Sequence, residues 1–152
     1  MDEDAQAFIA ELETRRQAKI SWKTYATWYG NNRGISREFG VFLYRCEETF
    51  FFEDFERNPS MFGISLKSKK KKEPFAKFEG FFTLEDVVST RQIVKTHAQR
   101  VTEGIRTTEE LPNVNMLDRI FRQLVEMVTL KDGSVHFFEL IDRKAFAVAL
   151  QA

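Results

Sequence analysis

The stretch LVEMVTLKDGSVHFFEL, residues 124–140, decides the fold at the level of sequence. Apolar and β-branched residues dominate on both sides of the triplet Lys131-Asp132-Gly133. An Asp-Gly pair between two such runs is typical of a tight hairpin turn. With the preceding RIFRQ included, the pattern predicts two antiparallel strands over residues 119–130 and 134–140.

The segment after this hairpin predicts a closing helix. Asp142 stands at an N-cap position before the run RKAFAVALQA. The apolar residues of this run have helical spacing and form one stripe: Ala145, Phe146, Ala149 and Leu150. Because a curled sheet leaves an open end, we expect Phe146 and Leu150 to plug it.

The middle of the chain carries many of the 16 phenylalanines and predicts four strands. Their segments are EFGVFLYRC, ETFFFEDFE, MFGISL and PFAKFEGFFTL. In the last segment, Phe78 and Phe82 lie on an apolar face and Phe81 lies on the opposite one. Because Phe50, Phe51 and Phe52 are consecutive, at least one must face away from the core, and we expect the N-terminal segment to cover it.

The N-terminal segment has a different character. Residues 2–19 have apolar residues at helical spacing and basic residues at the end, which predicts a helix. Aromatic residues three or four positions apart between Ile20 and Tyr29 predict a second short helix, which ends at the GNNRG break.

The region after the fourth strand is less regular. Residues 85–94, EDVVSTRQIV, predict a fifth strand because β-branched residues dominate. Residues 95–118 show no clear period and predict a long connection with some helical turns. A connection of this length is uncommon in a compact domain unless it carries a function.

Three segments together resemble the pleckstrin-homology (PH) superfold, including its GRAM-like and bacterial PH-like branches. They are GVFLYRCEETFFFEDF, similar to the opening hairpin, FFTLEDVVSTR, similar to a middle strand, and LVEMVTLKDGSVHFFELIDRKAFAVAL, similar to the final hairpin and helix. The resemblance covers about residues 36–151. PH domains that bind phosphoinositides carry a basic motif in the loop between the first two strands. The corresponding loop here, Cys46-Glu47-Glu48, is acidic, so no ligand residues are transferred.

The predicted fold class is therefore α+β. The resemblance implies a PH-like curled antiparallel sheet of about seven strands, closed by a C-terminal helix. We expect a helical extension over residues 1–35 and the PH-like domain over residues 36–152.

A lysine-rich stretch, SLKSKKKKEP, is the first candidate site. It could bind an anionic membrane surface, or nucleic acid, or an acidic protein, but it could also be a solvated hairpin tip. The candidate anion-binding residues are Lys67, Lys69, Lys70, Lys71, Lys72 and Lys77.

An aromatic cluster is the second candidate site. It could cover one face of the sheet, or it could be an exposed surface that binds a partner, because Trp and Tyr are favoured at the centres of interfaces. Its residues are Trp22, Tyr25, Trp28 and Tyr29.

Catalytic and metal-binding patterns are not recognised in the sequence. The chain has one cysteine and two histidines, without the spacing of a metal site, and lacks P-loop, nucleotide-binding and nucleophile-elbow motifs. We therefore expect a non-catalytic module without a cofactor.

Composition bears on location and partners. Net charge is zero, the N-terminus is acidic, and Cys46 is unpaired, which predicts a cytoplasmic protein that could sit peripherally at the inner face of the membrane. We expect a protein partner bound through the N-terminal helix and the sheet. An anionic membrane bound through the lysines is the alternative, a second copy is a further one, and nucleic acid is not expected.

Overall fold

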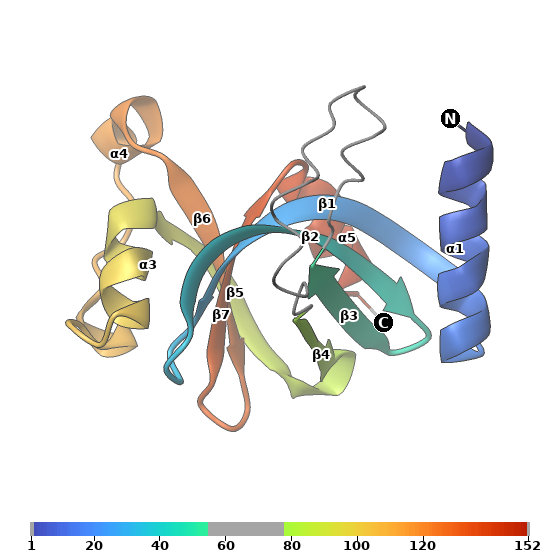
Figure 1. Cartoon of the computed structure of the whole chain (residues 1–152). Coiled ribbons are helices and arrows are strands. Elements are labelled where there is room, and N and C mark those ends of the chain that lie inside the picture. Colours follow the sequence, from blue (N-terminus) through green and yellow to red (C-terminus); the bar gives the residue numbers. More distant parts are fainter. Residues whose placement is uncertain (1, 55–77, 152) are drawn as a thin grey trace, which may run out of the picture.

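The computed structural model describes residues 2–54 and 78–151. In these residues, seven antiparallel strands form one sheet in the order β4-β3-β2-β1-β7-β6-β5, which curls into a half-barrel (Figure 1). The strands are β1 (Ile20–Asn31), β2 (Ser36–Cys46), β3 (Thr49–Asp54), β4 (Glu79–Thr83), β5 (Val87–Val94), β6 (Leu124–Leu130) and β7 (Val135–Leu140). The helices of the same residues are α1 (Asp2–Arg16), α3 (Lys95–Thr102), α4 (Met116–Phe121) and α5 (Arg143–Ala149), with short 3-10 turns η2 (Leu84–Asp86) and η3 (Thr108–Glu110). The predicted α+β class with a curled antiparallel sheet is confirmed.

The C-terminal hairpin and helix form as predicted. β6 and β7 pair antiparallel, and Gly133 takes a φ of 88° in the turn, a conformation that glycine adopts without strain. Asp142 caps α5 by accepting a hydrogen bond from the Ala145 backbone N–H at 3.1 Å. The first strand of this hairpin, β6, starts at Leu124 and not at residue 119 as predicted, because residues 116–121 form α4.

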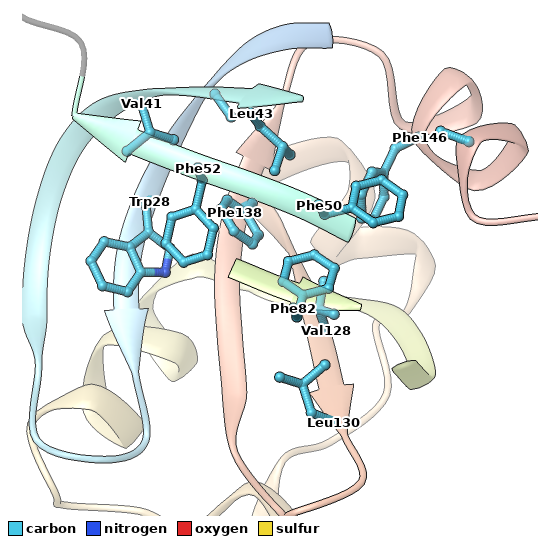
Figure 2. Packing of buried hydrophobic residues seen from close by; sticks show 12 residues of the cluster. Trp28, Val41, Leu43, Phe50, Phe52, Phe82, Val128, Leu130, Phe138 and Phe146 are labelled. Atoms are coloured by element: carbon cyan, nitrogen blue, oxygen red, sulfur yellow. The ribbon is translucent and has the colours of Figure 1, made fainter. Parts of the chain in front are cut away.

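The main core fills the concave side of the half-barrel, and α5 closes one end of it (Figure 2). Phe146 is 1% exposed and packs with its ring 5.6 Å from Trp22 and 5.9 Å from Phe50. Leu150 is partly buried against the same cluster. The predicted plug residues therefore occupy the expected place, and the rings of Trp28, Phe52 and other strand residues supply the rest of the core.

The predicted second short helix is wrong, because residues 20–31 form β1. β1 is the central strand of the sheet and pairs with β2 on one side and β7 on the other. Aromatic residues suit a strand when two neighbours supply hydrogen bonds and packing, and here that tertiary context outweighs the helical spacing. The predicted boundary between the N-terminal extension and the domain, residues 35 and 36, falls in the connection between β1 and β2. The acidic loop Cys46-Glu47-Glu48, predicted to join the first two strands, lies between β2 and β3.

Helix α1 covers the outer face of β2 and β3. Leu12 is fully buried against Phe42, Tyr44 and Cys46, with Phe51 and other residues at the margin. Phe51 is the member of the Phe50–Phe52 run that faces away from the main core, and the Arg16 guanidinium lies 3.9 Å from its ring centroid. The predicted cover of the outward-facing phenylalanine by the N-terminal segment is confirmed.

Helix α3 covers the other end of the sheet. Ala98 and Val101 are buried in a second outer cluster with residues of β1, β5, β6 and β7, such as Tyr29 and Phe137. Residues 95–118 were expected to be a connection with some helical turns, and they hold α3, η3 and the start of α4. Figure 1 shows α3 and α4 together at the end of the molecule opposite α1.

The remaining strand predictions are met in part. The predicted fifth strand is confirmed as β5. In β4, Phe82 is buried and Phe81 is exposed, as the alternation predicted. The predicted strand MFGISL, the lysine-rich segment and the start of the predicted fourth strand lie outside the described residues. Among the described helices, none is long and apolar enough to cross a membrane.

Candidate functional site

The two candidate sites taken from the sequence fare differently. Lys67, Lys69, Lys70, Lys71, Lys72 and Lys77 all lie outside the described residues, so the anion-binding prediction stays a prediction.

The four aromatic candidates of β1 do not form one surface. Trp22 and Trp28 point into the main core, and Tyr29 is buried in the cluster under α3, where its hydroxyl donates a 2.7 Å hydrogen bond to Glu139. Tyr25 is 48% exposed and its ring lies 5.3 Å from that of Phe42. Because the side chains of a strand alternate between its faces, these aromatics divide between the two faces of the sheet and do not cover one face of it, as the sequence had suggested.

One cluster of ionisable side chains lies beneath the end of α1. The buried carboxylate of Glu53 accepts a 2.7 Å hydrogen bond from the Tyr44 hydroxyl and lies 3.1 Å from Arg15 and 3.5 Å from Arg16. Glu79 of β4 lies within 3.6 Å of the same two arginines. Burial and the neighbouring Glu53 raise the pKa of Tyr44. These contacts tie the helix to the sheet and leave Glu53 matched in charge.

The two histidines lie on different elements, His97 on α3 and His136 on β7. His136 of β7 lies among the rings of the main core, and its Nδ1 accepts a 3.2 Å hydrogen bond from Trp28. Burial lowers the pKa of His136 to about 4. His97 lies on α3, where burial and then Arg106 lower its pKa. Among the described residues, no group of three or more His, Cys, Asp and Glu side chains could hold a metal ion.

Helix α4 carries the largest group of exposed apolar side chains on one described element. Four of its six residues are apolar and exposed: Met116 (75%), Leu117 (64%), Ile120 (63%) and Phe121 (78%). We call these four residues the α4 surface. Their positions i, i+1, i+4 and i+5 place them on one side of the helix.

The local sequence builds this short helix. Asn115 accepts a 2.8 Å hydrogen bond from the Asp118 N–H, and the Asp118 carboxylate accepts a 3.1 Å hydrogen bond from the Asn115 N–H. Such a reciprocal capping box stabilises a helix start that would otherwise be marginal in six residues. The helix is therefore held by its own caps, and its apolar side is left outside the core.

Two arginines lie on α4 and directly after it. Residues 91–123 contain six Arg or Lys and four Asp or Glu. Arg119 is exposed and donates to the Gln92 side chain at 3.0 Å, whereas Arg122 lies 3.5 Å from Asp118. The Asp118 side chain is only 18% exposed. Apolar side chains next to exposed arginines can bind an apolar surface bordered by negative charge.

The sequence reading missed this site, although a signal was present. Residues 115–121, NMLDRIF, contain the Asn and Asp of the capping box and an apolar stripe at helical spacing. The residues Arg119, Ile120 and Phe121 were predicted as the start of the following strand, which divides the stripe between two elements.

Comparisons with protein-family models, with characterised proteins and with solved structures found no match to the chain.

Proposed function

We propose that the chain is a non-catalytic, PH-like binding module that docks on another macromolecule through the α4 surface. The observation that carries the proposal is the exposure of Met116, Leu117, Ile120 and Phe121 side by side on one short helix. Soluble proteins rarely leave neighbouring large apolar side chains exposed unless the surface has a binding role.

The fold is consistent with the PH-like part of the proposal. The order of seven antiparallel strands, the curl of the sheet and the closing helix α5 are the features that the sequence resemblance implies. In this proposal the sheet is a scaffold, and α3 and α4 extend from one end of it (Figure 1). Binding residues on a loop that a rigid scaffold positions are a common arrangement.

The contact surface differs from the one expected from the sequence. The apolar side of α1 packs on its own sheet through Leu12 and its neighbours, so α1 and the outer face of β2 and β3 bury each other's apolar side chains. The α4 surface takes the role that the N-terminal helix was expected to have.

The chromatographic behaviour of the chain in a detergent-free extract of its native cells tests this proposal. The double variant Leu117→Ser with Phe121→Ser removes half of the α4 surface, and Val148→Ser changes a 65% exposed residue of α5 as the matched control. We expect the wild type and the control to elute in large particles and the double variant to elute later, as the free chain. Purified wild type run alone separates self-association from binding. Equal elution of all three chains in the extract would overturn the proposal.

A further inference from the structure

We infer that the α4 surface inserts into the interfacial layer of an anionic membrane, with neighbouring arginines at the level of the lipid headgroups. This inference rests on the proposed docking role of α4 and names the chemistry of its partner. It concerns residues 91–123, all of them described, and is independent of the lysine-rich segment.

The size of the α4 surface favours a lipid partner over a folded protein. A stable protein interface buries about 800 Å² on each side. The helix α4 has six residues and is about 9 Å long, so it is too small to supply such an area alone. A membrane interface needs no matching shape. It accepts a short amphipathic helix whose apolar side enters by about 5–10 Å. Four exposed side chains on one short helix therefore suit insertion into a membrane interface better than docking on a folded protein.

The placement of charge favours an anionic leaflet. Arg119 is exposed on the helix itself, and Arg122 follows the last apolar residue directly. Arg100, in the last turn of α3, is exposed as well, and the connection after α3 carries the exposed acidic residues Glu103, Glu109 and Glu110. The one acidic residue of α4, Asp118, is turned inward to cap the helix and to pair with Arg122. On α4 and directly after it, the exposed charges beside the apolar side chains are therefore those of Arg119 and Arg122, and anionic lipids attract them.

The position of α4 in the molecule permits the contact. Figure 1 shows α4 beside α3 at one end of the molecule, with the sheet between these helices and α1 at the opposite end. A flat surface can approach α4 without meeting the sheet first.

Co-sedimentation with vesicles tests the inference. The vesicles contain phosphatidylcholine alone, or phosphatidylcholine with about one third phosphatidylserine, at low and at moderate salt. We expect the wild type to bind only the anionic vesicles and more weakly at the higher salt. Leu117→Ser with Phe121→Ser should lower the partition coefficient by about tenfold or more, and Val148→Ser should leave it unchanged. Arg119→Gln should lower it by about fivefold.

A fluorescent reporter separates insertion from attraction by charge alone. Leu117→Cys labelled with an environment-sensitive dye should shift its emission to the blue on anionic vesicles, and Val148→Cys labelled in the same way should not. Retained binding with no shift at position 117 would overturn the inference.

The remaining outcomes distinguish this inference from the proposed function. The wild type could fail to bind anionic vesicles and yet elute in larger particles of the cell extract than the α4 double variant does. In that case the inference fails and docking on a protein stands. If both experiments are negative, the proposed function fails as well. If vesicle binding is lost only when Lys69, Lys70, Lys71 and Lys72 are changed to Ser, the lysine-rich segment is the lipid contact and the inference is overturned.

Discussion

The hydroxyl of Tyr44 donates a 2.7 Å hydrogen bond to the buried carboxylate of Glu53, directly beneath the last turn of α1. The two residues come from neighbouring strands, β2 and β3, and Arg15 and Arg16 reach the same carboxylate from the helix. One carboxylate thus connects the helix to two strands. The apolar contacts of Leu12 and Phe51 lie beside it, so both ion pairs and apolar burial hold α1 on β2 and β3.

Glu53→Gln tests this joint. The substitution keeps the shape of the side chain but removes the buried negative charge, so among the described residues Arg15 and Arg16 retain only the more exposed Glu79 as an acidic partner. We expect the free energy of unfolding to fall by about 2 kcal/mol, measured by urea denaturation. Glu85→Gln, at an exposed residue of η2, is the matched control and should change stability by less than about 0.5 kcal/mol. Equal effects of the two substitutions would contradict the role given to Glu53.

Stability should fall on acidification because of His136. Burial lowers the pKa of this side chain from 6.5 to about 4, so the unfolded chain binds a proton at a higher pH than the folded one. Stability present above pH 6.5 is therefore lost as the pH falls to about 4, by about 3 kcal/mol in all. His136→Asn retains an acceptor for Trp28 and does not titrate. Its unfolding free energy should vary less steeply over this pH range, and an unchanged slope would refute the assignment.

Gly80→Ala should destabilise the packing of β4 on the core. A Cβ at this position would lie 2.5 Å from Cζ of Phe52, whose ring is fully buried. Because a close-packed core resists such intrusion, we expect a loss of about 1–3 kcal/mol in thermal or urea unfolding. Gly40→Ala in β2 meets nothing within 4 Å and serves as the control. A neutral Gly80→Ala would show that β4 can move away from Phe52.

Phe146→Ala should open the end of the half-barrel that α5 closes. The ring is buried against Trp22 and Phe50, and its removal leaves a cavity that the sheet cannot fill by a small movement. We expect a loss of about 3–5 kcal/mol, measured by urea denaturation. Val148→Ala on the exposed side of the same helix should cost less than about 0.5 kcal/mol. If the two variants are equally stable, α5 is not part of the core.

The C-terminal hairpin and the closing helix could be predicted because their signals are local. Asp132 and Gly133 fix a turn between two adjacent strands, and Asp142 marks the start of the next helix. The need for a cover over Phe51 could also be inferred, since three consecutive phenylalanines cannot all face one core.

β1 and α4 could not be read correctly for physical reasons. The partners of β1 are β2 and the distant β7, and a register irregularity between Trp28 and Gly30 breaks the alternation that would have indicated a strand. Only Arg122 and Gln123 separate the apolar stripe of α4 from the apolar residues of β6, and the sequence pattern does not mark the end of the helix there. The exposure of the α4 surface depends on tertiary structure, and the sequence pattern alone would equally suit a buried helix.

The rate of maleimide labelling at Leu117→Cys in intact native cells, relative to the purified protein, tests the central claim most directly. Val148→Cys is the matched control, because the two wild-type side chains are 64% and 65% exposed. The native Cys46 is buried and burial raises the pKa of its thiol, so it should label slowly in both settings. If α4 is the docking surface, position 117 is protected in cells and position 148 is not. Equal labelling of the two positions in cells would contradict the proposed function.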